Sequence, residues 1–438
     1  MCLLLSVALI AGLCLLVYQD WQNGRDWAIY EGNRDVYADG DLAKGAVYDR
    51  KGELLMRNTK KGMKFNEDSS VRAACMHITG DKDNNISTGV NRAFLDRLIG
   101  YDFVNGIYSL NNKGEDIQLT LDSGLCAAAY DAMAGRKGTV GVYNYKTGEI
   151  LCMVSCPTYD PENVPYEVAD GTYINRFIHG TFAPGSTFKV LTTAAAIENG
   201  ITDYTYTCYG SEDYGHGDYV TDVTPHYECD LTKALEVSCN CYYGKLSEKL
   251  GSSLIKEYVE KANLNSSYNI DGIETKKSTF DYPDGGVTLA WTGIGQWHDM
   301  VNPCAMMVFM GGIAGDGTAV SPSIILPGFV GETVDKIIPP EKIEMIDEDT
   351  AQKLKKMMHN NVEAHYGGEG YFPGISKRLC AKTGTAEVAG QSQPNSWFVG
   401  FLDDSKNPYA FVVLVEEGGY GIDAAGSVAN TVLQYLAD

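Results

Sequence analysis

Residues 182–193 read FAPGSTFKVLTT, a turn at Pro184-Gly185 followed by the start of an expected helix. Ser186 stands at the mouth of that helix, and Lys189 lies one turn further along on the same face. A serine hydroxyl needs an adjacent base to become a nucleophile, and a lysine serves when burial or neighbouring cations keep it neutral. The positive end of the helix dipole also lies where an oxyanion would form. The stretch therefore predicts a serine nucleophile activated by Lys189.

Single copies of such motifs carry little weight, because they recur in this chain. The spacing Ser-x-x-Lys is found again at Ser253 and Lys256, inside the pattern of an ordinary exposed helix. The spacing Ser-x-Asn begins at Ser109, Ser238 and Ser267. A site starting at Ser253 would leave only a short loop before Ser267, too little to form a separate wall. Order along the chain therefore favours Ser186 with Lys189, followed by Ser238 with Asn240.

The tripeptide Lys-Thr-Gly also occurs twice. Its first copy, Lys146-Thr147-Gly148, separates two runs of apolar alternation, at 139–145 and 149–155, and is predicted to be the turn of a β-hairpin. The second copy, Lys382-Thr383-Gly384, is followed by Thr385 on a predicted strand and comes after both other motifs. We expect chemistry at the second copy and a purely structural role for the first.

The ordered set Ser-x-x-Lys, Ser-x-Asn and Lys-Thr-Gly is the one found in penicillin-binding proteins and serine β-lactamases. On these motifs the chain resembles the class B penicillin-binding proteins, the monofunctional D,D-transpeptidases of bacterial wall synthesis. The resemblance runs from about Lys44 to the end of the chain. Its segments are KGAVYDRKGELL, IQLTLD, TGEILCMVSCPTYDP, NRFIHGTFAPGSTFK, EVSCN, GIGQWHDMVNP, AKTGTAEV and WFVGF.

The resemblance implies a donor stem peptide of peptidoglycan that ends in D-Ala-D-Ala. Ser186 would attack the penultimate D-Ala carbonyl while Lys189 accepts its proton. Ser238 would pass a proton to the leaving amine, and Asn240 would hydrogen-bond the peptide amide. An amine from a neighbouring stem would then resolve the acyl-enzyme as a cross-link.

The resemblance also implies how the second Lys-Thr-Gly copy binds substrate. Lys382 would place positive charge near the terminal carboxylate and help to keep Lys189 neutral. Thr383 and Thr385, on either side of Gly384, would offer hydroxyl groups to that carboxylate. The backbone N–H groups of Ser186 and Thr385 would form the oxyanion hole. β-Lactam antibiotics would acylate the same serine, and no metal or organic cofactor is expected.

The pattern of elements predicts a mixed α/β (α+β) fold. Two strands precede a series of helical patterns, and three strands and a closing helix at 424–436 follow them. This order predicts one sheet whose terminal elements come together across a helical layer. By resemblance, the sheet is a central antiparallel one flanked by helices, as in penicillin-binding proteins and serine β-lactamases, and a small β-rich pedestal precedes it.

Three segments are expected along the chain. Residues 1–19 are uncharged and mostly apolar, and they predict a single-pass, uncleaved transmembrane anchor with the rest of the chain outside the cytoplasm. Residues 20–115 form the pedestal, or dimerisation-like, domain. Residues 116–438 form the penicillin-binding transpeptidase domain. By resemblance, the expected membrane partner is a glycan polymerase of the shape, elongation, division and sporulation family.

The charge balance argues against nucleic acid as a partner. With 57 acidic and 35 basic residues the net charge is -22, which opposes binding to a phosphate backbone through a broad basic face.

The chain has 12 cysteines and seven histidines, and the histidines show no metal-ligand spacing, so no metal site is predicted. Cys208 and Cys229 flank a polar loop and are candidates for a disulfide. Cys239 and Cys241 flank Asn240 and are expected to be small buried residues rather than a redox-active pair.

Two other function classes share these motifs. The first is a β-lactam hydrolase or sensor, although the pedestal and the long catalytic region exceed what a compact β-lactamase needs. The second is an inactive scaffold for wall-synthesis partners, against which the intact motifs argue.

Overall fold

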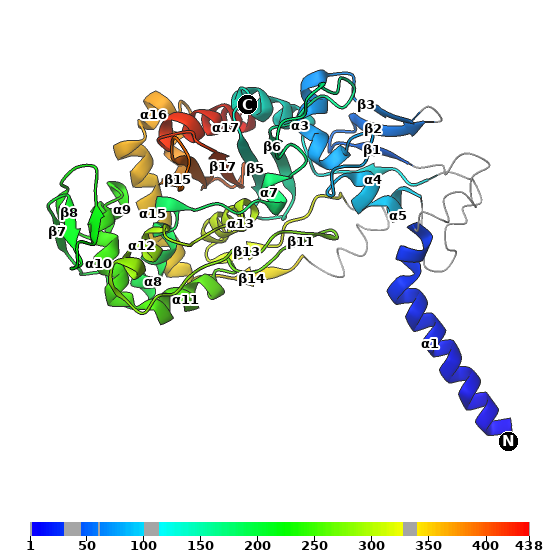
Figure 1. Cartoon of the computed structure of the whole chain (residues 1–438), viewed down its shortest axis with the longest axis horizontal. Helices are drawn as coiled ribbons and strands as arrows, with labels where there is room; N and C mark the ends of the chain where they lie inside the picture. The colour runs from blue at the N-terminus through cyan, green and yellow to red at the C-terminus, as the bar shows by residue number, and fades with distance from the viewer. Residues whose placement is uncertain (1, 30–44, 60–61, 100–113, 327–339, 438) are drawn as a thin grey trace.

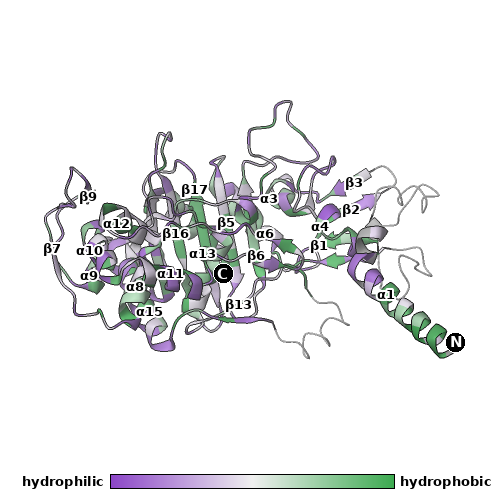
Figure 2. Cartoon of the chain, turned by 60° about the horizontal axis from the view of Figure 1, so that its bottom comes forward, coloured by the Kyte–Doolittle hydropathy of each residue, from purple (hydrophilic) through white to green (hydrophobic). Residues whose placement is uncertain are grey.

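The structure, a computed structural model, describes residues 2–29, 45–59, 62–99, 114–326 and 340–437. Helix α1 (Cys2–Ile29) contains an apolar stretch, Leu3–Gly24, that is long enough to cross a membrane and is not buried against the rest of the protein. The helix continues past Gln19, where the predicted anchor ends. Figure 2 shows hydrophobic residues over its N-terminal turns and more hydrophilic residues where it approaches the small domain.

The small domain is built on a four-stranded sheet in the order β3-β2-β1-β4. Strands β1 and β2 pair antiparallel around a turn at Lys51-Gly52, where Gly52 has a φ of 85°. Strand β4 follows the predicted boundary at residue 115 and pairs in parallel with β1. The sheet and its helices comprise β1 (Ala46–Tyr48), β2 (Leu54–Thr59), β3 (Gly62–Phe65), β4 (Ile117–Gln118), α3 (Ser69–Thr79), α4 (Val90–Ala93) and α5 (Leu95–Leu98).

The large domain is organised around a five-stranded antiparallel sheet in the order β15-β16-β17-β5-β6. Its strands are β5 (Gly138–Asn144), β6 (Ile150–Cys156), β15 (Leu379–Ala386), β16 (Asn395–Leu402) and β17 (Tyr409–Val415). The last strand of the chain pairs with the first of the sheet, β5, so the prediction that distant segments share one sheet is confirmed. Figure 1 shows these strands side by side, with helices packed around them.

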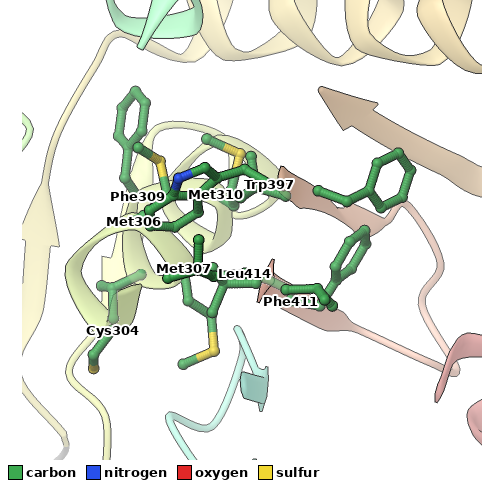
Figure 3. Packing of buried hydrophobic residues seen from close by; sticks show 14 of the residues in the cluster. Cys304, Met306, Met307, Phe309, Met310, Trp397, Phe411 and Leu414 are labelled. Atoms are coloured by element: carbon green, nitrogen blue, oxygen red, sulfur yellow. The ribbon is translucent and has the colours of Figure 1, made fainter. Parts of the chain in front are cut away.

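Helices cover both faces of this sheet, which explains why β16 is buried along its whole length. Helix α13 (Pro303–Ala314) packs on one face, where Met307 and Met310 point toward Leu414 and Trp397 (Figure 3). Helices α6 (Ser123–Met133) and α17 (Ser427–Ala437) lie together on the opposite side, next to β6 and β17. The sheet is therefore a rigid support for residues on its edge strand, β15.

A helical layer beyond β15 carries the other motifs. Its helices are α8 (Lys189–Glu198), α9 (Leu231–Glu236), α10 (Asn240–Leu250), α11 (Ser252–Lys261), α12 (Gly286–Ile294), α15 (Glu348–His365) and α16 (Gly368–Tyr371), with 3₁₀ turns at Gly185–Thr187 and Ser376–Arg378. The short helix α7 (Arg176–His179) packs instead against β5, β6 and α13. The short strands are β7 (Tyr206–Cys208) with β10 (Tyr227–Cys229), β8 (Ser211–Asp213) with β9 (Tyr219–Thr221), β11 (Asn269–Ile270) with β12 (Ile273–Glu274), and β13 (Thr318–Val320) with β14 (Lys342–Glu344).

The residues around Ser238 do not form one continuous helix. The chain over 230–251 is broken between α9 and α10, because Ser238 adopts a left-handed φ of 58°. The closing helix predicted from Ala424 begins instead as a π-helical turn, Ile422–Gly426, that leads into α17.

Candidate active site

Ser186 lies in the 3₁₀ turn immediately before α8, at the edge of a cleft of about 1080 Å³. The turn needs Gly185, since its φ is 53° and a Cβ there would lie 2.7 Å from the carbonyl oxygen of Thr385. Two contacts hold the turn against the rest of the domain. Gly185 N donates to Gly295 O at 2.8 Å, and Trp397 Nε1 donates to Ala183 O at 2.9 Å. The backbone around Ser186 is thus held by the end of α12 on one side and by strand β16 of the sheet on the other.

Lys189, at the start of α8, is fully buried. Its Nζ donates to Ser238 O and to Asn240 Oδ1, both at 2.7 Å, and lies 3.3 Å from Ser238 Oγ. Burial lowers the pKa of this ammonium group to about 8. Lys189 is therefore an amine that can be deprotonated near neutral pH, as a general base requires.

Ser238 and Asn240 lie where α10 begins, on the wall opposite the sheet. The left-handed conformation of Ser238 aims both its carbonyl oxygen and its Oγ at Lys189. Asn240 Nδ2 donates to Thr221 O at 2.8 Å, and its backbone N donates to Asp222 Oδ1 at 2.6 Å. Loop contacts thus fix the Asn240 amide so that its oxygen accepts from Lys189.

Lys382 reaches the same point from the opposite direction, on strand β15. It is fully buried, and its Nζ donates to Ser238 Oγ at 3.0 Å and to Thr383 O at 3.1 Å. Burial, together with the nearby Lys189, lowers its pKa well below the usual value for a lysine. The two amines and the Ser238 hydroxyl therefore form one connected group.

Thr383 and Thr385 are two residues apart on β15, so their side chains lie on the same face of the strand. Both residues line the cleft. Gly384, between them, faces the nucleophile turn, the 3₁₀ turn at Gly185–Thr187 that carries the predicted nucleophile Ser186. A Cβ on Gly384 would lie 2.8 Å from Pro184 O and 2.9 Å from Thr187 Cγ2. The glycine thus allows β15 to approach the nucleophile turn closely while the two threonine side chains remain available to a bound ligand.

The rival motif copies lie elsewhere. Lys146 is exposed in the β5–β6 turn, and Asn144 Oδ1 accepts from its backbone N at 2.9 Å, so this copy is a turn, as predicted. Ser253 and Lys256 are exposed on α11, where Lys256 lies 3.9 Å from Glu260. Ser267 precedes the short strand β11, and Ser109 lies outside the described residues.

The structure adds residues that the motifs do not reveal. Tyr366, just after α15, is buried and accepts a hydrogen bond at 3.1 Å from the backbone N of Thr383, which orients β15 at the site. Asp222, after β9, accepts from the backbone N of Asn240 and of Cys241 at 2.6 and 3.0 Å. Neither position belongs to a periodic pattern, so only the tertiary fold brings them to the site.

The predicted disulfide between Cys208 and Cys229 is wrong, since both are free thiols. They sit on paired strands, but Cys208 is opposite Tyr227 and Cys229 is opposite Tyr206, so the two cysteines do not face each other. Cys239 and Cys241 are buried free thiols, which agrees with their expected packing role.

Comparisons with known proteins agree on one family. The family model described as the penicillin binding protein transpeptidase domain matches residues 138–434. The peptidoglycan D,D-transpeptidase PbpA of Mycolicibacterium smegmatis is 27% identical over 387 residues, which cover 78% of this chain and 76% of the relative. The peptidoglycan D,D-transpeptidase MrdA of Acinetobacter baumannii is 26% identical over 369 residues, which cover 74% of this chain and 54% of the relative.

Solved structures show the same fold. Penicillin-binding protein A from M. tuberculosis, solved as a ceftriaxone acyl-enzyme complex, superposes with a TM-score of 0.78 at 23% identity, covering 90% of this chain and 98% of that one. The same protein has been solved as a penicillin G acyl-enzyme complex, with a TM-score of 0.77.

Proposed function

Because this chain belongs to the penicillin-binding protein transpeptidase family, we propose that it is a peptidoglycan D,D-transpeptidase that forms its acyl-enzyme on Ser186. The observation that carries the assignment of residues is the convergence of Lys189 and Lys382 on Ser238, beside the nucleophile turn, with Asn240 accepting a second hydrogen bond from Lys189. In this assignment Ser186, Lys189, Ser238, Asn240 and Lys382 carry the chemistry, and Thr383, Gly384 and Thr385 bind the substrate.

Acylation begins with Ser186 Oγ attacking the carbonyl carbon of the penultimate D-Ala. The hydroxyl proton passes to the neutral Nζ of Lys189, whose burial makes the neutral form accessible. A tetrahedral oxyanion forms, for which the backbone N–H groups of Ser186 and Thr385 are the donors. The C–N bond then breaks, and the leaving D-Ala amine takes a proton through Ser238 Oγ, which contacts both lysines.

Binding of the substrate carboxylate determines which of the two lysines carries the positive charge. In the free site burial disfavours the charged form of both amines. A carboxylate bound beside Thr383 and Thr385 favours the charged form of Lys382, because opposite charges stabilise each other at short range. A charged Lys382 in turn favours a neutral Lys189. Substrate binding thus prepares the base that the first step needs.

Deacylation by an amine completes the reaction. The amine of a neighbouring stem peptide attacks the ester carbonyl of the acyl-enzyme and loses a proton, and Ser186 Oγ leaves and regains one. The products are a new amide cross-link and free enzyme. A β-lactam enters the first step in the same way, but its opened ring remains attached, so the acyl-enzyme persists.

Helix α1 supports the location that we propose. Its apolar stretch anchors the chain in the cell membrane, and the catalytic domain faces the wall on the outer side. A glycan polymerase of the shape, elongation, division and sporulation family would supply new strands within reach of this anchored enzyme.

The test uses a synthetic donor peptide ending in D-Ala-D-Ala and an amine acceptor, with products followed by mass spectrometry. The proposal expects release of one D-Ala together with a donor–acceptor amide, and neither product with Ser186→Ala. Hydrolysis of the donor without any amide, under saturating acceptor, would contradict a transpeptidase. Rapid turnover of penicillin would instead indicate a β-lactam hydrolase.

A further inference from the structure

Three exposed tyrosines lie between the Ser-x-x-Lys and Ser-x-Asn motifs, and none of them has a role in the chemistry described above. Tyr209, after β7, is 74% exposed, Tyr219, in β9, is 50% exposed, and Tyr227, in β10, is 63% exposed. Val223, shortly after β9, is 86% exposed. We call these four residues the tyrosine patch. Aromatic and apolar side chains that gather on a surface mark a binding site for a partner.

The tyrosine patch is continuous with the active-site cleft. Tyr219 and Thr221 are the two exposed positions of β9, so their side chains lie on one face of the strand, about 7 Å apart. Thr221 and Val223 line the cleft. The patch therefore extends the wall of the cleft outward, and one long ligand can occupy both surfaces.

Strand pairing and one backbone hydrogen bond bring the other two tyrosines to the same place. Asp222 N donates to Gly210 O at 3.0 Å, which puts Tyr209, the neighbour of Gly210, beside the segment that lines the cleft. Tyr227 is the partner of Cys208 across β7 and β10, so it lies next to Tyr209. The tertiary fold thus assembles the tyrosine patch from three short segments.

The charge of this region limits the kind of partner. Residues 190–232 contain no lysine or arginine, and Asp218 and Glu228 are exposed carboxylates. Lys245, on the neighbouring helix α10, pairs with Glu212 at 3.3 Å, so its charge is compensated. Anionic partners are therefore disfavoured. Carboxylates accept hydrogen bonds from hydroxyl groups, and tyrosine rings offer flat apolar faces, so a neutral chain of sugar rings fits this surface.

The position of this region in the molecule argues against a lipid surface as the partner. Figures 1 and 2 place β7 and the helices α9 and α10 at the end of the molecule opposite the membrane helix α1. In an enzyme anchored by α1, this end lies far from the membrane. The partner is therefore a component of the wall rather than of the bilayer.

We propose that the tyrosine patch binds the glycan strand that carries the donor stem peptide, with tyrosine rings stacked on N-acetylhexosamine rings. This rests on the proposed function, since the stem peptide in the cleft is what brings its own glycan strand to the patch. The exposed carboxylates accept hydrogen bonds from sugar hydroxyl groups. The enzyme therefore recognises a glycan-linked donor at two places and a free stem peptide at only one.

The first test measures binding without catalysis. Glycan strands freed of their stem peptides are titrated into the full-length chain in detergent, and binding is followed by calorimetry. A double variant, Tyr209→Ala with Tyr219→Ala, is expected to weaken binding about tenfold or more, because each ring removed loses one stacking contact. Tyr166→Ala is the matched control, since Tyr166 is a fully exposed tyrosine in the loop between β6 and α7, and it should bind as the wild-type chain does.

The second test compares two donors that end in D-Ala-D-Ala, one free and one attached to a glycan strand. The double variant is expected to lower kcat/KM about tenfold for the glycan-linked donor, chiefly through KM, and to leave the free donor and acylation by penicillin unchanged. Equal use of the two donors by the wild-type chain, no binding of stem-free strands, or equal loss in Tyr166→Ala would overturn the proposal.

These measurements separate the tyrosine patch from the proposed transpeptidase. Binding of stem-free strands that is lost in the double variant, in a chain that forms no cross-link, would contradict the proposed function but support the patch. Normal reaction of the free donor without any glycan binding would do the reverse. Salt-sensitive capture of a basic protein by the patch, with no glycan binding, would indicate a protein partner and would also overturn the proposal.

Discussion

Lys189 and Lys382 reach one oxygen atom from opposite walls of the site, with Nζ atoms 3.3 and 3.0 Å from Ser238 Oγ. Both side chains are fully buried, and this burial lowers the pKa of both amines. The hydroxyl between them is therefore placed to pass a proton from one step of the reaction to the next. The hydrogen bond between Ser238 and Lys382 joins residues 144 positions apart in the sequence.

The acylation rate should rise with pH. In the proposed mechanism Lys189 acts as a base only when it has lost its proton, and burial lowers its pKa to about 8. The second-order rate constant for acylation by penicillin is therefore expected to be low below pH 7 and to rise as Lys189 loses its proton near pH 8. Stopped-flow measurement with a chromogenic β-lactam checks this. A rate that falls between pH 7 and pH 9, while the protein remains folded, would refute Lys189 as the base.

Gly185→Ala should abolish acylation, because the glycine combines a positive φ with close packing. The φ of 53° disfavours a side chain, and a Cβ would also lie 2.7 Å from Thr385 O, so the nucleophile turn must shift away from β15. A strained alanine alone costs about 1–2 kcal/mol, and the clash adds to that cost. Labelling by penicillin measures the loss of acylation, and urea unfolding measures the loss of stability.

Gly200→Ala is the matched control for that variant. Gly200 has a φ of 70°, but a Cβ added there would meet nothing within 4 Å, and the residue lies at the far end of α8. The free energy of unfolding of this variant should fall only by the cost of placing an alanine at positive φ, about 1–2 kcal/mol, and labelling by penicillin should remain complete. Equal labelling by the two variants would show that contact between the nucleophile turn and β15 is unimportant.

Tyr366→Phe should weaken both stability and acylation. The phenol oxygen accepts from the backbone N of Thr383 and hydrogen-bonds to Thr383 Oγ1, each at 3.1 Å. Its removal leaves a buried donor without a partner, at a cost of about 1–3 kcal/mol in the free energy of unfolding. Strand β15 should then position Thr383 less well, so acylation slows. Tyr371→Phe, which removes a hydrogen bond to Ile422 O away from Thr383, should leave the acylation rate unchanged.

Patterns local to the sequence predict much of the fold. The alternation at 139–145 and 149–155 predicts β5 and β6, and the long apolar start predicts α1, because these signals depend on neighbouring residues alone. The order of three short motifs predicts that Ser186, Lys189 and Lys382 share one site. Motif order succeeds here because the rival copies at Lys146 and Ser253 stand in the wrong order or too close to the next motif.

The remaining features depend on tertiary contacts. Ser238, with its left-handed backbone, interrupts a segment whose residue pattern is typical of one continuous helix. Its carbonyl oxygen accepts a hydrogen bond from Lys189 instead of from a helical N–H group. Tyr366 and Asp222 support the site through backbone N–H groups, an interaction that leaves no residue pattern in the sequence. The predicted partner of Cys208 is wrong because strand register, which the sequence does not give, decides which side chains face each other.

The intact mass of the chain during incubation with penicillin tests the central claim most directly. The claim predicts one adduct per chain on Ser186 that persists for hours, no adduct with Ser186→Ala, and a normal adduct with Lys146→Ala, whose side chain is exposed in a hairpin turn. An adduct that turns over within minutes would identify a β-lactam hydrolase instead. Strong labelling of Ser186→Ala, or no adduct on the wild-type chain, would contradict the assignment of the nucleophile.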